Sequence, residues 1–304
     1  MQPRQPGADS VEEVSKALAD HGYLADEGLA TAVFLALALR RPLFLEGDAG
    51  VGKTEVAKVL AAWTGGELLR LQCYEGINFG QAAYEWDYSR QLLHLRAVEA
   101  TGESAREAED EIYDERFLVR RPLLRALEPR IGPVPVLLVD EIDRADDEFE
   151  AFLLEILSEY AVTVPELGTV RAESPPIVVL TSNRTRDVHD ALKRRCLYHW
   201  VEHPAFDREV EIVRLRAPEA SVRLARQIAA ASAALRELGL YKPPGVAETI
   251  DWASAVAALG RSELDEHTVE VTLGAVLKYQ EDQMRARAAG LSDIVRAAVL
   301  RSGA

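Results

Sequence analysis

A glycine-rich segment at residues 47–54 constrains the fold of this 304-residue chain more than any other feature. It reads GDAGVGKT, which fits the pattern GxxxxGK[ST], and it lies between an apolar run at 43–45 and a helical segment at 55–63. Glycines in this context let backbone N–H groups fold around phosphate oxygens at the start of a helix. A turn that only joined a strand to a helix would leave the lysine and the threonine without a role. The residues predicted to bind a nucleotide are Gly47, Asp48, Ala49, Gly50, Val51, Gly52, Lys53 and Thr54.

Two acidic residues directly follow another apolar run, at 136–139. Asp140 is predicted to bind Mg²⁺ together with the Thr54 hydroxyl, while Lys53 neutralises the charge of the β- and γ-phosphates. Glu141 is predicted to polarise the attacking water, which indicates hydrolysis. The alternative is a strand that simply ends at an acidic loop, because further acids follow at 143–148. The glycine-rich segment upstream favours the catalytic interpretation.

Three more polar residues are candidates for catalysis. Asn183 follows the apolar run 177–180, where it can reach the γ-phosphate or the water, or it can cap a turn. Arg194 and Arg195 come about one helix later. Either can be an arginine finger that stabilises transition-state charge in a neighbouring subunit, or the pair can complement a helix dipole. The residues alone leave both alternatives open.

The remaining pattern predicts an α/β part followed by a helical part. Apolar runs at 43–45, 68–73, 136–139 and 177–180 alternate with helical segments, which is typical of a parallel sheet flanked by helices. Beyond residue 204, helical periodicity recurs at 208–214, 222–238, 252–259 and 269–284. We therefore expect a partly disordered lead-in at 1–20, an α/β nucleotide-binding domain at 21–203 and a helical lid domain at 204–304.

Composition restricts the class of binding partner and the cellular compartment that we expect for this chain. The 35 basic and 50 acidic residues give a net charge of −15, which disfavours nucleic acid as a partner. The longest apolar stretch, 29–39, is far shorter than the roughly 20 residues of a membrane span, and the N-terminus does not resemble a secretory signal. The two cysteines lack the spacing of a metal or redox motif. These features predict a cytoplasmic protein.

The segments GDAGVGKT, VLLVDEIDRAD, TSNRTR and ALKRRC, in this order and followed by a helical part, resemble the AAA+ ATPases and, within them, the MoxR group. The resemblance runs from about residue 23 to residue 283. The alternating segment 162–170, with a turn at Gly168, predicts the β-hairpin that this group carries. The strings LQCYEG, YEWDYSRQLLHLRA, ALKRRCLYHW and LKYQED are similar to the CoxD-like branch, which is associated with maturation of carbon monoxide dehydrogenase and related molybdenum hydroxylases.

The resemblance implies an AAA+ P-loop core with a helical lid, ATP and Mg²⁺ as cofactors, and ATP hydrolysis. It also implies a homo-oligomeric ring, a hexamer, that remodels a client metalloenzyme during cofactor insertion, with a von Willebrand A-domain protein as partner. The residues carried over by position are Lys53 and Thr54 for Walker A, Asp140 and Glu141 for Walker B, Asn183 for sensor 1, and Arg195 for the finger. Arg194 is a second finger candidate, because a double arginine leaves the register ambiguous by one residue.

Two positions stay open in this comparison. The resemblance places Tyr23 near the adenine as a stacking partner, although an ordinary packing role fits equally well. Relatives in the broader group carry a sensor 2 arginine at the start of a lid helix, whereas this chain has Thr249-Ile-Asp-Trp252 there. Two other functions remain alternatives: a nucleic-acid motor or loader, which the net charge opposes, and a nucleotide-switched scaffold with little turnover, which Glu141 opposes.

Overall fold

The computed structural model describes residues 9–101, 111–165 and 167–302. The chain divides into two compact units. The first comprises Met1–Val14, Glu27–Glu46 and Ala57–His199, and the second comprises Ser15–Asp26, Gly47–Val56 and Trp200–Ala304. The glycine-rich segment therefore belongs to the same unit as the C-terminal helices, whereas the acidic residues that follow residue 139 belong to the first unit.

A five-stranded sheet forms the centre of the first unit. Its strands are β1 (Leu43–Glu46), β2 (Leu68–Gln72), β5 (Val136–Asp140), β8 (Ile177–Ser182) and β9 (Leu197–Trp200), in the spatial order β2-β5-β8-β1-β9. Strands β2, β5, β8 and β1 pair in parallel, which confirms the α/β prediction. Strands β1, β5 and β8 are buried along their whole length, because helices cover both faces of such a sheet.

The register of the sheet aligns the polar ends of its strands. Glu46 pairs with Ser182, and Gln72 pairs with Asp140. Strand β9 was not predicted from the sequence. The helices assigned wholly to the first unit are α2 (Glu27–Leu39), α4 (Phe79–Ala82), α5 (Tyr88–Thr101), α7 (Pro122–Leu127), α8 (Asp147–Glu159) and α9 (Asp190–Arg195). Helix α3 (Lys53–Thr64) begins within the second unit and ends in the first.

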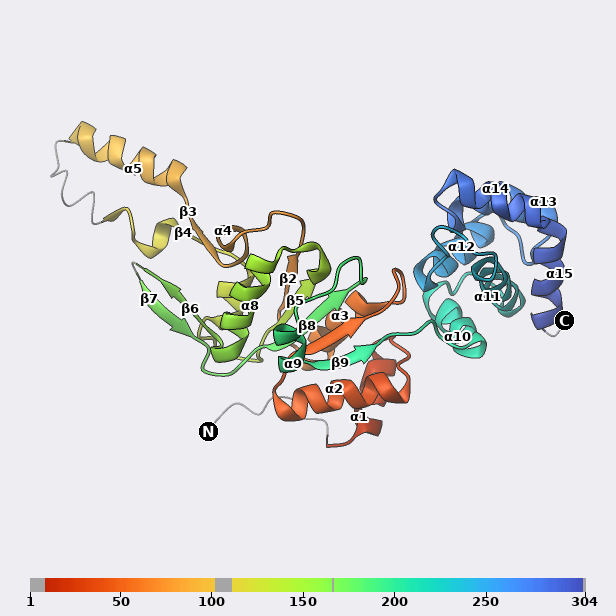
Figure 1. Ribbon diagram of the computed structural model, residues 1–304, viewed down its shortest axis with the longest axis horizontal. Helices are drawn as coiled ribbons and strands as arrows, with labels where there is room; N and C mark the ends of the chain where they lie inside the picture. The colour runs from red at the N-terminus through yellow and green to blue at the C-terminus, as the bar shows by residue number, and fades with distance from the viewer. Residues whose placement is uncertain (1–8, 102–110, 166, 303–304) are drawn as a thin grey trace. The chain divides into compact units, whose positions relative to one another are not determined.

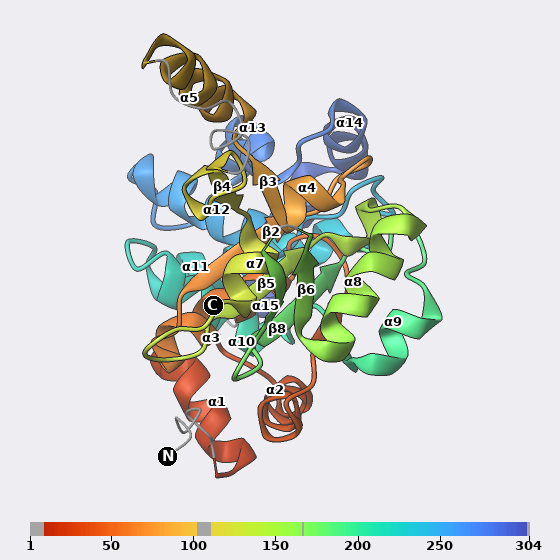
Figure 2. The ribbon, with the colours of Figure 1, turned by 90° about the vertical axis from the view of Figure 1, so that its left-hand side faces the viewer.

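Two antiparallel strand pairs extend from the sheet within the first unit (Figures 1 and 2). One pair is β6 (Ala161–Val164) with β7 (Gly168–Arg171), which confirms the predicted hairpin; residue 166 lies outside the described residues. The other pair is β3 (Tyr84–Trp86) with β4 (Leu118–Arg120), and α5 stands out beyond it. Helix α5, called the α5 insertion below, carries exposed apolar side chains at Tyr88, Leu92 and Leu93.

The second unit is helical. Its C-terminal helices are α10 (Phe206–Arg216), α11 (Val222–Arg236), α12 (Val246–Ala258), α13 (Glu266–Val276), α14 (Gln280–Ala289) and α15 (Leu291–Ser302). Trp252 lies fully buried in its core, and its indole N–H donates to the Thr272 hydroxyl at 2.8 Å. The prediction of one helical segment at 269–284 is wrong. The chain breaks after α13 because Leu277 is extended and fully buried, and its carbonyl accepts from the Gln283 side chain at 2.9 Å.

The N-terminal part of the chain contains a helix inside the predicted lead-in. Helix α1 (Val11–Asp20) has Val14 and Leu18 fully buried, so packing orders this stretch. Residues 1–8 of the lead-in lie outside the described residues. Residues 15–20 of the predicted lead-in, and residues 21–26 and 47–56 of the predicted α/β domain, are grouped with residues 200–304 in the second unit.

Candidate functional site

The predicted phosphate loop forms a tight turn between the end of β1 and the start of α3. Gly50 and Gly52 have φ values of +81° and +93°, which are left-handed conformations that favour glycine. A Cβ on Gly47 would lie 2.4 Å from the Val201 carbonyl oxygen, so a side chain is excluded there as well. Asp48 and Ala49 are exposed in this turn, whereas Val51 is buried. The glycine pattern is therefore required by the geometry of the turn.

Lys53 lies at the first position of α3 with its side chain folded back over the loop. Its Nζ donates to the carbonyl oxygens of Gly47 at 2.7 Å and Asp48 at 2.6 Å, and the residue is buried. Thr54 follows in the first turn of the helix. A buried cation, a helix N-terminus and a glycine turn are thus held together, and these features fit the β- and γ-phosphates of a nucleotide.

Tyr23 lies beside this loop. A Cβ on Gly52 would be 3.7 Å from Tyr23 Cε2, so the aromatic ring covers that glycine. Burial raises the pKa of the Tyr23 hydroxyl well above its ordinary value, and the nearby carboxylates of Asp26 and Glu55 raise this pKa further. The phenol is therefore neutral at physiological pH. The structure places Tyr23 next to the phosphate loop, while its role toward adenine stays a prediction.

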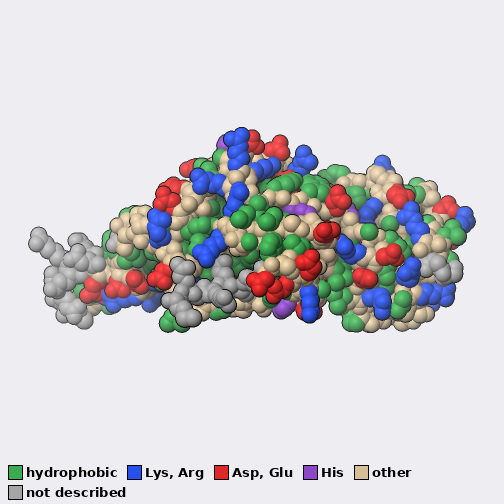
Figure 3. Space-filling view, turned by 90° about the horizontal axis from the view of Figure 1, so that it is seen from below, with side chains coloured by type: hydrophobic (Ala, Val, Ile, Leu, Met, Phe, Trp, Pro, Cys, Tyr) green, Lys and Arg blue, Asp and Glu red, His purple; other side chains and the backbone are tan. Residues whose placement is uncertain are grey.

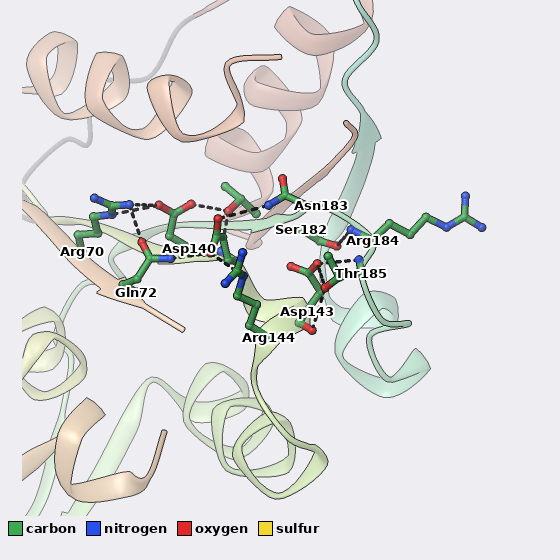
Figure 4. A network of polar contacts seen from close by, with 11 residues as sticks. Arg70, Gln72, Asp140, Asp143, Arg144, Ser182, Asn183, Arg184 and Thr185 are labelled. Carbon is green, nitrogen blue, oxygen red and sulfur yellow. Dashed lines mark hydrogen bonds and ion pairs between the residues drawn. The ribbon is translucent and has the colours of Figure 1, made fainter. Parts of the chain in front are cut away.

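The predicted acidic residues and Asn183 form one hydrogen-bonded cluster in the first unit (Figure 4). The Thr181 hydroxyl donates to Asp140 Oδ1 at 2.6 Å and accepts from the Glu141 N–H at 2.9 Å. The Asn183 amide donates to Glu141 Oε1 at 3.3 Å. Because β5 and β8 are neighbours in a parallel sheet, their carboxyl ends bring these side chains together.

Three residues that the sequence analysis did not single out surround the two carboxylates. Arg70, on β2, donates to Asp140 Oδ2 through Nε at 3.0 Å and Nη2 at 2.6 Å. Gln72 donates to Glu141 Oε2 at 3.0 Å, and Arg144 forms an ion pair with the same oxygen at 2.9 Å. The alternating polar positions of the run LLRLQ were the only available signal, and they do not reveal which strand β2 pairs with.

The backbone at this cluster is strained at two residues. Glu141 has φ +55° and Arg184 has φ +59°, which for a residue with a side chain costs about 1–2 kcal/mol. The Arg184 N–H is satisfied by the Ser182 hydroxyl at 3.0 Å, and its side chain extends away from the cluster in Figure 4. Such strain persists where the surroundings impose it, often at functional sites.

The two finger candidates lie at the end of α9 and are not part of the acidic cluster. Arg41 donates through Nη2 to the Arg194 carbonyl at 2.8 Å and through Nε to the Arg195 carbonyl at 3.2 Å, so the end of the helix is held in place. Both arginine side chains are exposed. Within the described part of the chain, neither guanidinium has a hydrogen-bond or ion-pair partner.

Comparison with known proteins agrees with this geometry. The family model described as AAA domain, dynein-related subfamily, matches residues 42–196, a span that contains the phosphate loop, the acidic cluster and both finger candidates. No curated protein sequence gives a significant match. Among the helices that the structure describes, none is long and apolar enough to cross a membrane.

Solved structures match this chain at low sequence identity and with TM-scores below 0.5. A protein of Cytophaga hutchinsonii provisionally assigned as an ATPase is 14% identical, with a TM-score of 0.47, and the match covers 96% of this chain and 93% of that one. The Thermotoga maritima RuvB Holliday junction branch migration motor is 15% identical, with a TM-score of 0.45, over 88% of this chain and 73% of that one. The family match over half of the chain is the decisive comparison: the chain belongs to the dynein-related AAA domain family and is an AAA+ ATPase that binds ATP with Mg²⁺.

Proposed function

We propose that the chain is a MoxR-type AAA+ ATPase of the cytoplasm, which hydrolyses ATP in a ring oligomer, a hexamer, to remodel a partner protein. An α/β nucleotide-binding domain at 21–203 and a helical lid at 204–304 would make up each subunit. The observation that carries the hydrolytic part is the cluster in which Thr181 ties Asp140 to Glu141 and Asn183 contacts Glu141.

Each residue has a separate task in this mechanism. Lys53 would neutralise phosphate charge, and the Thr54 hydroxyl and the Asp140 carboxylate would hold Mg²⁺. When bound, Mg²⁺ supplies positive charge that stabilises the phosphate oxygens. Glu141 accepts the proton of the attacking water, and Asn183 orients that water or the γ-phosphate. The side chains of Gln72 and Arg144 fix the Glu141 carboxylate from the opposite side, which keeps its position defined.

The finger is proposed to act between subunits. Arg195, with Arg194 as the second candidate, would stabilise transition-state charge at the phosphate loop of its neighbour. Two observations support this role. Both side chains are exposed, so a neighbouring subunit can reach them, and hydrogen bonds from Arg41 to their carbonyl oxygens position the main chain at both residues.

Mixing of variants tests the shared site. Arg195→Ala should bind ATP and fail to hydrolyse it, and Lys53→Ala should fail to bind. Rings that contain both variants should recover activity, because some interfaces then pair an intact loop with an intact finger. Strictly additive activities in mixtures that exchange subunits would reject action between subunits, and the same experiment with Arg194→Ala identifies the arginine.

Two surfaces are suited to transmit the conformational change to a client. The β6–β7 hairpin presents exposed Leu167 near its turn, and the α5 insertion presents exposed Tyr88, Leu92 and Leu93. Resemblance to the CoxD-like branch supports a molybdenum hydroxylase as client and a von Willebrand A-domain protein as partner. A strain that lacks this gene should accumulate cofactor-deficient hydroxylase. Complete metal centres in that strain would remove the maturation role and leave the ATPase assignment intact.

A nucleic-acid motor is less well supported. The net charge is −15, and acidic and basic side chains are interspersed over the face drawn in Figure 3. Binding through phosphates instead requires several lysines and arginines that act together. A gel-shift titration with duplex DNA at increasing salt separates the two functions, because the proposed remodelling ATPase should give no salt-dependent shift.

A further inference from the structure

Helix α12 begins directly against the phosphate loop. The carbonyl oxygen of Gly50 accepts from the N–H groups of Val246 at 3.0 Å and Ala247 at 3.2 Å. These are the first two residues of α12, and N–H groups in the first turn of a helix have no partner within the helix. The N-cap residue is Gly245, which has no side chain to satisfy them. The phosphate loop therefore caps the helix through its main chain.

The two chain segments approach so closely that neither can carry a side chain at the contact. A Cβ on Gly245 would lie 2.8 Å from both the Ala49 carbonyl oxygen and Gly50 Cα. A Cβ on Gly50 would lie 3.1 Å from Gly245 Cα. Gly245 has an ordinary φ of −82°, so its backbone conformation would tolerate alanine. Glycine is needed at residue 245 because of the contact alone.

The contact also fixes one peptide group of the loop. The structure has no cis peptide bond among the described residues, and in a trans peptide the C=O and the N–H point in opposite directions. The Gly50 carbonyl points at α12, so the Val51 N–H of the same peptide points away from α12. Two hydrogen bonds accepted by the carbonyl also polarise the peptide and make that N–H a better donor. Helix α12 thus orients an N–H group of the phosphate loop.

On its other side, the start of α12 is anchored in the helical core. Arg236 donates through Nε to the carbonyl of Pro244, the residue before Gly245, at 2.7 Å. The same guanidinium forms a bidentate pair with buried Glu209, at 2.8 and 2.6 Å, and the Thr249 hydroxyl donates to Glu209 at 2.9 Å. These bonds join α10, α11 and α12. A displacement of Gly245 would therefore move or strain the three helices together.

We propose that Gly245 is a positioning residue for nucleotide binding and that its main-chain contact with Gly50 couples the phosphate loop to the C-terminal helices. The proposal rests on the role of the loop proposed above. Helix α12 contains no basic residue, so the coupling works through backbone hydrogen bonds and close packing rather than through a side-chain cation. Because such coupling is reciprocal, nucleotide on the loop should also stabilise the start of α12.

Two glycine-to-alanine variants test the contact. Gly245→Ala places a methyl group against Ala49 and Gly50, whereas Gly274→Ala in α13 adds the same group where only Gln283 Nε2 lies within 4 Å, at 3.8 Å. With ADP and Mg²⁺ as the probe, we expect Gly245→Ala to weaken binding about tenfold or more and Gly274→Ala to leave it within twofold. Equal affinities of the two variants would overturn the proposal.

Hydrogen exchange of the unmodified protein gives a second test that needs no variant. ADP with Mg²⁺ should slow amide exchange at 246–247 by about tenfold, and unchanged exchange at saturating ADP would overturn the coupling. The variant Lys53→Ala distinguishes a failure of the proposed role of the loop from a failure of the coupling. If that variant binds ADP as tightly as the parent, the role of the loop fails; if it loses binding while Gly245→Ala keeps parental affinity, only the coupling fails.

Discussion

The hydroxyl of Thr181 links the Asp140 carboxylate to the main-chain N–H of Glu141, so replacing it with a methyl group tests how the acidic cluster is built. Thr181→Val keeps the shape of a fully buried strand residue and removes the bonds to Asp140 Oδ1 and from the Glu141 N–H. A hydrogen bond to a charged group contributes about 1.5–3 kcal/mol and a neutral one about 1 kcal/mol. Because Arg70 still compensates the Asp140 charge, we expect the free energy of unfolding to fall by about 2.5 kcal/mol.

Urea denaturation followed by circular dichroism measures this change, and Thr163→Val is the matched control. Thr163 lies on the β6–β7 hairpin, where the residue is exposed and its hydroxyl contacts the Thr169 hydroxyl at 3.0 Å. That substitution should change the free energy of unfolding by less than about 0.5 kcal/mol. ATP turnover of Thr181→Val should fall while its ATP affinity changes little, since the main chain at Glu141 loses the hydrogen bond that its N–H donates to Thr181. Equal stability of the two variants would refute this account of the cluster.

Two further predictions concern buried groups away from the loop. Burial raises the pKa of the thiols of Cys73 and Cys196 to about 12, so both thiols stay protonated at pH 8. Iodoacetamide should therefore not label them until urea unfolds the chain. Labelling of the native protein as fast as the unfolded protein would contradict this prediction. Glu209→Ala removes the carboxylate that pairs with the largely buried Arg236 guanidinium. We expect the free energy of unfolding, measured by urea denaturation, to fall by about 3–5 kcal/mol. A loss below about 1 kcal/mol would contradict this prediction.

The parts of the site that the sequence predicted are those with a local signal. Asp140, Glu141 and Asn183 each follow an apolar run, and parallel strands bring their carboxyl ends to one edge of the sheet. Arg70 and Gln72 could not be assigned in this way. Their contacts depend on β2 lying next to β5, and strand order is a non-local property of the fold.

In the C-terminal helical part, too, the sequence predicted local features but not contacts between distant residues. Periodicity predicted several of its helices, and the structure shows Trp252 completely buried in their core. The contact between Gly245 and Gly50 could not be foreseen, because two glycines so far apart in the sequence carry no sign that they meet. The break after α13 was missed because buried Leu277 continues the apolar pattern across it.

The most direct test of the central claim, ATP hydrolysis with Glu141 as the water-activating group, is a single-turnover measurement on Glu141→Gln. Glutamine keeps the size of the side chain and one acceptor oxygen, and it removes the basic carboxylate. With ATP at full occupancy, we expect parental binding and a rate of hydrolysis lower by at least about a hundredfold, in line with the loss of a general base. Hydrolysis at the parental rate under the same conditions would contradict the account.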